Sequence, residues 1–134
     1  DVDLFNKAAK EQGLSELTKY IPLEVTKNDF DGVLQSEWFM PDEYKNMDIY
    51  SYLEQRCETH EEINRVDKEF TEYDKRGMMP LLCYMVYLVD FMRENKIVWG
   101  VGRGSSVASY ILYIIGVHKV NSIQYGLDFN EFMR

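Results

Sequence analysis

The chain has 134 residues, of which 46% are hydrophobic, and this is enough apolar material for one ordinary core. Its formal net charge of −8 argues against broad electrostatic attraction to nucleic acid, because such binding relies on many lysines and arginines. The first residues lack the apolar segment of a signal peptide, and the longest apolar run, residues 107–117, is too short to cross a bilayer. We therefore expect a cytoplasmic protein that does not associate with a membrane.

The first half of the chain predicts short helices and one or two short strands. Residues 3–12 have the pattern of a short helix, and Ser15 is a suitable N-cap for a second helix. Residues 23–41 mix apolar side chains with turn signals, which predicts one or two strands. Asp48 is the expected cap of a helix over about 49–57.

The second half gives clearer signals. A threonine followed three residues later by a glutamate is a capping box, and it predicts a helix over 59–76. The next predicted helix, 80–95, is apolar nearly all round and should be largely buried. Residues 97–99 predict a short strand that leads into a glycine-rich loop, and a helix over about 105–115 should follow. Residues 125–133 should pack as a short strand or helix.

The glycine-rich loop Gly100-Val101-Gly102-Arg103-Gly104-Ser105-Ser106 is a candidate phosphate cradle. Glycine has no Cβ, so backbone N–H groups can approach a ligand closely, and a helix N-terminus adds further donors. The arginine supplies a planar fork of donors that suits phosphate oxygens. The spacing fits neither a Walker A loop nor a dinucleotide fingerprint. The candidate phosphate ligands are Gly102, Arg103, Gly104 and Ser105, with the Arg103 side chain expected to be exposed.

These elements predict an α+β fold that is mostly helical, with a small sheet in which a strand, the glycine-rich loop and a helix follow one another. An N-terminal segment of helix and short strands, residues 1–40, should precede the main part, residues 41–134, within one compact domain. The loop lies in the only region with a positive balance, because residues 76–134 hold four acids against six bases.

Several spaced motifs agree, in order, with one family pattern. The family reads Gly-Pro-Gly-Arg-Gly-Ser where this chain has residues 100–105, and Arg-Leu-Glu-Tyr-Glu-Leu where it has residues 65–70. Its Glu-Asn-Gly-Ile corresponds to residues 94–97, and its Leu-Phe-Glu-Arg-Phe to the segment that ends at Phe132. Over roughly residues 40–133, the chain thus resembles the palm domain of the C-family bacterial replicative DNA polymerases, the α subunit of DNA polymerase III.

The resemblance implies a nucleotidyltransferase-like fold, a part in DNA replication, and triphosphate contacts by Arg103, Gly104 and Ser105. The family's two-metal chemistry with Mg²⁺ uses carboxylates of a downstream Pro-Asp-x-Asp segment, which these 134 residues do not contain. The family's arginine in Phe-Glu-Arg-Phe is Glu131 here, and an acid repels a triphosphate. We therefore expect a truncated relative or fragment that holds no cofactor, is catalytically incomplete alone, and binds dNTP or DNA phosphate weakly at most.

Two other functions stay open. The chain could be a stand-alone, acidic, non-catalytic module, for example phage-encoded, that uses the palm-derived fold as a scaffold for a protein partner. Alternatively, other carboxylates, such as Asp90 and Asp128, could make it a complete catalyst. The partner surface in the first case is either an acidic helix face (Glu58, Glu61, Glu62, Asp67, Glu69, Glu72 and Asp74) or an aromatic patch (Trp38, Phe39, Tyr44, Tyr50 and Tyr52).

Overall fold

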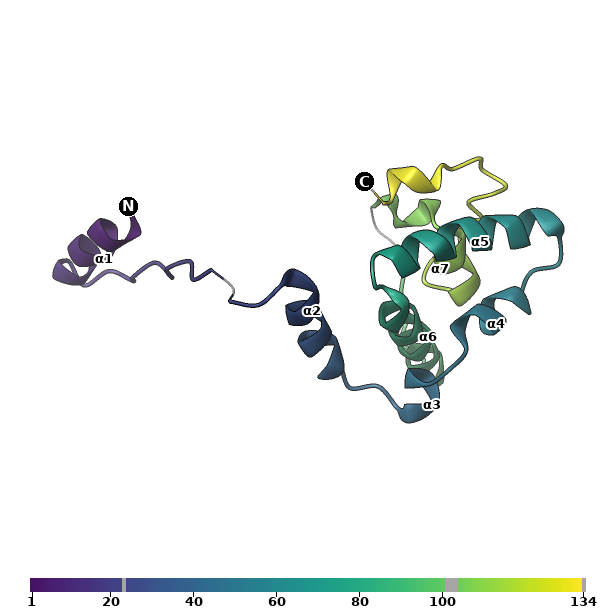
Figure 1. The fold of residues 1–134 in the computed structure, drawn as a ribbon, viewed down its shortest axis with the longest axis horizontal. Helices are drawn as coiled ribbons and strands as arrows, with labels where there is room; N and C mark the ends of the chain where they lie inside the picture. Colours follow the sequence, from purple (N-terminus) through teal and green to yellow (C-terminus); the bar gives the residue numbers. More distant parts are fainter. Residues whose placement is uncertain (23, 101–103, 134) are drawn as a thin grey trace. The chain divides into compact units, whose positions relative to one another are not determined.

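The structure, a computed structural model, describes residues 1–22, 24–100 and 104–133. Contacts divide the chain into two compact units, Asp1–Trp38 and Phe39–Arg134. All regular secondary structure in the described residues is helical (Figure 1). The predicted α+β fold with a small sheet is therefore wrong, because the described residues form no strand. No helix in this described part is long and apolar enough to cross a membrane.

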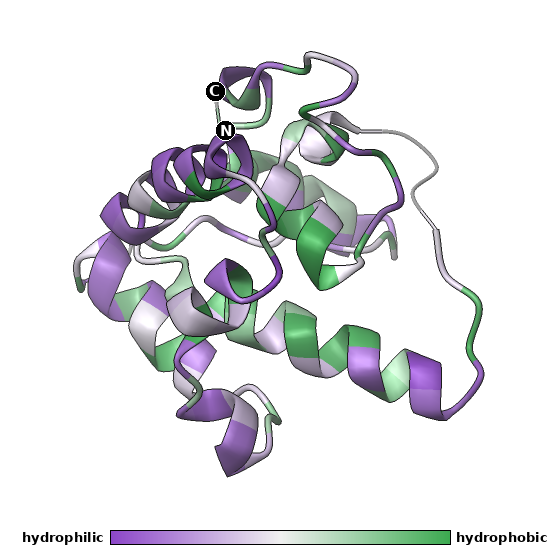
Figure 2. Ribbon diagram, turned by 90° about the vertical axis from the view of Figure 1, so that its right-hand side faces the viewer, coloured by the Kyte–Doolittle hydropathy of each residue, from purple (hydrophilic) through white to green (hydrophobic). Residues whose placement is uncertain are grey.

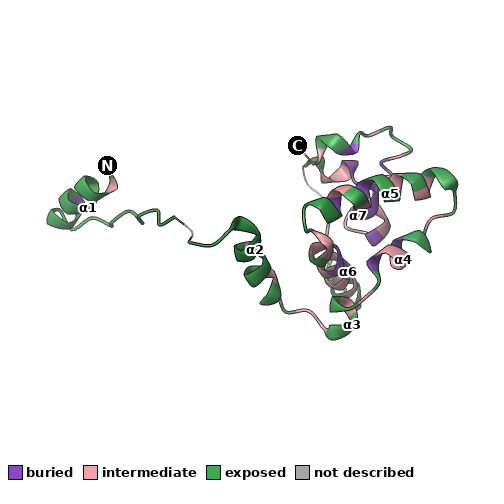
Figure 3. Cartoon of the chain, viewed as in Figure 1, coloured by how far each residue is buried: buried purple, intermediate pink, exposed green. Residues whose placement is uncertain are grey.

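The first unit contains two ten-residue helices with N-terminal side-chain caps. Helix α1 (Val2–Glu11) begins after Asp1, whose carboxylate accepts a hydrogen bond from the Asp3 amide. Helix α2 (Lys27–Ser36) begins after Thr26, whose hydroxyl accepts from an amide in the first turn. Figure 3 shows both helices as mostly exposed, and Ala9 is the one buried residue described in this unit.

Two predictions for the first unit are wrong. No helix follows Ser15, because the Asn6 side chain binds both the N–H and the C=O of Leu17, at 2.7 and 2.8 Å, and holds that segment in an irregular turn. The mixed segment after it forms α2 in place of strands. There Thr26 and Asp29 bind each other reciprocally, so a local cap starts a helix.

The second unit is a cluster of helices around one apolar core. Helices α5 and α7 pack against each other, α4 and α6 both contact α7, and α3 packs on α6. Buried side chains of four helices, including Leu53, Tyr73, Leu82 and Ile111, meet in the core. Figure 2 shows how apolar and polar residues are distributed along these helices. The elements are α3 (Asp42–Lys45), α4 (Ile49–Glu54), α5 (His60–Lys75), α6 (Met79–Glu94), the 3₁₀ turn η1 (Ser105–Ala108), α7 (Tyr110–Ile115) and the 3₁₀ turn η2 (Phe129–Glu131).

Helix α5 begins at the predicted capping box. The Thr59 hydroxyl accepts from the Glu62 amide at 3.2 Å, and the Glu62 carboxylate accepts from the Thr59 amide at 3.0 Å. The prediction of a largely buried α6 is also confirmed in its central turns, where Leu82, Val86 and Val89 are almost fully covered. Strong local signals therefore located the two longest helices of this unit.

The elements that flank the glycine-rich loop differ from the prediction. Residues 97–100 form no strand, because they find no partner strand among the described residues, and the Trp99 indole donates to the Gly116 carbonyl at 3.0 Å. The helix expected over 105–115 breaks at Ser109, whose φ of −83° and ψ of 117° are extended. The break separates η1 from α7.

Candidate functional site

The glycine-rich loop is described on its C-terminal side. Gly102 and Arg103 lie outside the described residues, so the exposure of Arg103 and the contacts of both residues stay predictions. Gly104 precedes η1 with a φ of 145°, a conformation that favours glycine. Gly104 and Ser105 are both exposed, so their backbone and hydroxyl groups are accessible from solvent.

A buried carboxylate already occupies the N-terminus of α7. Glu69, on α5, is 0% exposed, and its two oxygens accept from the amides of Tyr110 and Ile111 at 2.8 and 3.0 Å. The next amide, of Leu112, donates to the Ser109 hydroxyl. The first three N–H groups of α7 are therefore satisfied inside the protein, and an anion at the loop depends on the loop and η1 alone.

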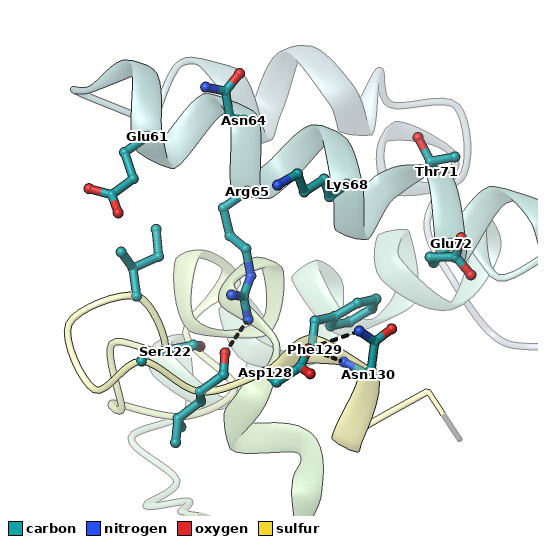
Figure 4. Close-up of a pocket in the computed structure, with 13 residues that line it drawn as sticks. Glu61, Asn64, Arg65, Lys68, Thr71, Glu72, Ser122, Asp128, Phe129 and Asn130 are labelled. Atoms are coloured by element: carbon teal, nitrogen blue, oxygen red, sulfur yellow. Dashed lines mark hydrogen bonds between the residues drawn. The ribbon is translucent and has the colours of Figure 1, made fainter.

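Arg65 extends this network toward the C-terminal segment. Its Nε donates to Glu69 at 2.6 Å, and its Nη2 donates to the carbonyls of Ala108 and Leu127 at 2.7 and 2.9 Å. The Arg65 side chain is 20% exposed, and Figure 4 shows it reaching from α5 toward the segment that ends in η2. The largely buried Arg65 guanidinium is stable because its counter-ion, Glu69, and its carbonyl acceptors are all present.

The same network includes two hydroxyl groups. Ser109 Oγ donates to the Glu69 carboxylate at 2.8 Å and lies 3.0 Å from the Tyr73 hydroxyl. Burial raises the pKa of Tyr73 well above its ordinary value, so this phenol stays protonated at neutral pH. The break between η1 and α7 is thus held from α5 by a carboxylate, a guanidinium and a phenol.

The turn that bears Glu131 packs against the turn that follows the glycine-rich loop. Turns η1 and η2 are in contact, and η2 is anchored by Phe129, whose ring centroid lies 5.8 Å from that of Tyr73. Asp128 begins η2 by accepting from the Asn130 amide, whereas Glu131 is exposed. Two segments singled out by the family resemblance, at Ser105 and at Glu131, therefore lie side by side.

An open groove of about 1030 Å³ runs between α5 and the segment that leads into η2. Its lining mixes polar and apolar groups in similar measure, and Arg65 lies within it (Figure 4). On α5 the basic groups Arg65 and Lys68 alternate with the acidic groups Glu61 and Glu72, and Asp128 adds a further acid from the opposite segment, so the groove has no strong preference for an anion.

The predicted acidic face of α5 is partly wrong, because Glu69 is buried and paired. Val66, Glu69 and Tyr73 follow one another at spacings of three and four residues, and all three are buried. Glu69 thus lies on the apolar face of α5, with an arginine four residues before it. This combination is the signal that could have identified the Arg65–Glu69 pair from sequence. Sequence reasoning missed both Arg65 and Glu69 as residues that support the loop.

The other candidate residues have structural partners of their own. Asp90, on α6, accepts hydrogen bonds from the Tyr44 hydroxyl at 3.2 Å and from Arg93 at 3.3 Å. Asp128 caps η2 instead, so the two carboxylates belong to different elements. Tyr44 packs on Tyr87 of α6. In the described ranges, no cluster of three or more His, Cys, Asp or Glu residues is arranged to hold a metal ion.

Rings of the predicted aromatic patch pack on two different helices of the second unit. Phe39 and Tyr44 pack against Tyr87, whereas Tyr50 packs against Phe70 of α5. Phe39 is 80% exposed, while Tyr44 is half-buried.

Comparison with known proteins identifies the family to which the chain belongs. Residues 43–134 match the family described as bacterial DNA polymerase III alpha NTPase domain, and the chain therefore belongs to that family. The matched region begins in α3 and includes the glycine-rich loop, α5, η1, α7 and η2. The resemblance first drawn from the loop motifs is thus confirmed at the level of the family.

Individual relatives are DNA polymerase III α subunits from several bacteria. The chain is 28% identical to that of Buchnera aphidicola from Acyrthosiphon pisum over 90% of its length, and 27% identical to that of Aquifex aeolicus over 83%. A stretch covering 54% of the chain is 32% identical to the subunit of Thermotoga maritima. The chain spans only 9–11% of the length of these relatives, so it is homologous to a small part of a DNA polymerase III α subunit. No solved structure matches the chain.

Proposed function

We propose that this chain is the nucleotide-contacting part of a DNA polymerase III α-like protein, that it serves DNA replication in the cytoplasm, and that its loop contacts the phosphates of a deoxynucleoside triphosphate. The observation that carries the proposal is the buried Arg65–Glu69 pair. It anchors Ala108, Tyr110 and Ile111 directly after the loop, whereas Gly104 and Ser105 are exposed. A rigid support close in sequence to exposed Gly104 and Ser105 groups is the arrangement that a phosphate contact requires.

The proposed contact is made by the loop and not by a helix end. Glu69 occupies the N-terminus of α7, so the available donors are the Gly104 and Ser105 groups together with Arg103 and Gly102. This set can bind phosphate oxygens, but it lacks the paired carboxylates that hold two Mg²⁺ ions for phosphoryl transfer. We therefore propose that the chain does not extend a primer by itself.

Glu131 opposes phosphate binding in this proposal. Its turn packs against η1, which begins at Ser105, and a negative charge on that turn disfavours an anion at the loop. A charge-assisted hydrogen bond contributes about 1.5–3 kcal/mol, and replacing such an attraction by a repulsion weakens binding at least about tenfold. We expect a Kd for dATP of about 1 mM or weaker.

Calorimetric titration with dATP and Mg²⁺ tests the proposal. Glu131→Arg should bind dATP at least about tenfold more tightly than the parent chain. Glu54→Arg makes the same change in net charge on an exposed residue of α4 and should leave the affinity near the parent value. Equal affinities in the two variants would contradict a specific role of Glu131.

A second pair of variants tests the loop itself. In the Glu131→Arg background, Arg103→Ala should remove the gained affinity, whereas Lys119→Ala removes an exposed positive charge elsewhere and should not. Undiminished binding after Arg103→Ala would refute the loop as the phosphate site. Primer extension by the parent chain, abolished by a substitution within it, would refute the proposed lack of catalysis.

A further inference from the structure

Two turns that are far apart in sequence meet at one guanidinium group. Ala108 is the last residue of η1, and Leu127 directly precedes the cap of η2; the carbonyls of both accept from the same Nη2 atom of Arg65.

We propose that Arg65 is a positioning residue that holds η2 against η1, and that it thereby determines how strongly Glu131 opposes phosphate at Gly104 and Ser105. This inference rests on the proposed phosphate contact. It assigns Arg65 a role in regulating the affinity of that site, beyond supporting the fold.

The chemistry of the contact requires an arginine. Nε donates to Glu69 while Nη2 donates to two carbonyls, and the planar fork makes these three bonds without rotating away from its counter-ion. A lysine keeps the positive charge but has one donor nitrogen, whereas the arginine uses Nε for Glu69 and Nη2 for the two carbonyls. It can retain the Glu69 partner and still fail to span both carbonyls.

Besides Arg65, side-chain hydrogen bonds tie the segment to the rest of the unit on either side of η2. Ser122 Oγ donates to the Val107 carbonyl at 3.0 Å, and Arg76 donates to the Met133 carbonyl at 3.2 Å. Between these two points, Leu127 receives its side-chain hydrogen bond from Arg65, and Phe129 supplies apolar packing. Loss of the Arg65 fork should therefore loosen η2 locally while the segment stays attached at both ends.

Amide hydrogen exchange tests the positioning role without any nucleotide. Arg65→Lys should raise the exchange rate of the Ser109, Glu131 and Phe132 amides, which close η1 and η2, at least about tenfold relative to the α6 amides. The control is Val86→Ala, a cavity in the α6 face of the core, which should raise exchange in α6 without this selectivity. Unchanged exchange in η1 and η2 of Arg65→Lys would overturn the inference.

A double-mutant cycle tests the consequence for phosphate affinity. Glu131→Arg should tighten dATP binding at least about tenfold in the parent and in Val86→Ala, but less than about threefold in Arg65→Lys, because η2 no longer holds residue 131 near the loop. This loss of energetic coupling between positions 65 and 131 is not expected from a variant that only destabilises the core.

The outcomes separate the inference from the proposed function. If Glu131→Arg gains affinity in the parent and gains equally in Arg65→Lys, the role of Arg65 is refuted and the phosphate contact stands. If Glu131→Arg gains nothing in the parent, the opposing role of Glu131 is refuted and the effect of Arg65 on it fails with it, whereas the loop contact itself is decided by Arg103→Ala. In that case the exchange measurement still decides whether Arg65 joins the two turns.

Discussion

Replacing Glu69 by glutamine should be among the most damaging isosteric changes in this protein. The carboxylate is fully buried and receives four donors: the Arg65 Nε, the Ser109 hydroxyl and the amides of Tyr110 and Ile111. Each carboxylate oxygen faces one backbone N–H. A glutamine NH₂ group must therefore point a donor at a donor, whichever way the amide is turned.

The magnitude follows from this geometry. Glu69→Gln removes the counter-ion of a largely buried arginine and leaves at least one buried N–H without an acceptor. Breaking a buried ion pair from one side costs about 3–5 kcal/mol, and an unsatisfied buried polar group costs about 1–3 kcal/mol; the two penalties overlap here. We expect the free energy of unfolding to fall by about 3–5 kcal/mol.

Urea unfolding, followed by helical circular dichroism and tryptophan fluorescence, measures this loss. Glu72→Gln is the matched control, because Glu72 lies three residues further along α5 and pairs with Lys75 and Arg76 at the surface. Exposed pairs of this kind contribute about 0–1 kcal/mol, so the control should stay close to the parent. A Glu69→Gln variant within about 1 kcal/mol of the parent would refute the assignment of Glu69 as the buried anchor of α7.

Two further predictions concern pH and backbone conformation. Burial raises the pKa of Tyr73 and Tyr110 above the ordinary value of 10.0, so the stability that they contribute is complete below pH 10 and is lost as the pH rises beyond it. The urea midpoint of unfolding should therefore fall between pH 9 and about 11.5. It should fall less steeply with pH in Tyr110→Phe than in the parent, and identical pH dependences of the midpoint would contradict this reasoning. Gly116→Ala should lower the free energy of unfolding by about 1–2 kcal/mol, and by more than Gly77→Ala does, which urea unfolding can measure. Gly116 has a φ of 94°, and a Cβ there meets the Arg93 guanidinium, whereas the space around Gly77 is open.

Local hydrogen-bonding patterns allowed part of the fold to be predicted. The capping box of α5 joins residues three apart in the chain, and the apolar character of α6 is visible in sixteen consecutive residues. Both helices were therefore placed correctly without tertiary information. The motifs around the loop likewise identified the family, because the order and spacing of residues carry that signal. The strand predicted at residues 97–99 failed for the complementary reason, since a strand requires a partner that no local pattern supplies.

The sequence by itself therefore determined where the long helices α5 and α6 lie, to which family the chain belongs, and which residues make up the glycine-rich loop. Only the tertiary structure decided that Glu69 is buried, that it occupies the N-terminus of α7, and that η2 packs beside η1. The physical reason is that these features depend on contacts between residues some forty to sixty positions apart in the chain, such as Glu69 with Tyr110 and Arg65 with Leu127. The same glutamate in isolation is an ordinary charged helix residue, and its burial becomes favourable only when two backbone amides of α7 join Arg65 of its own helix as partners.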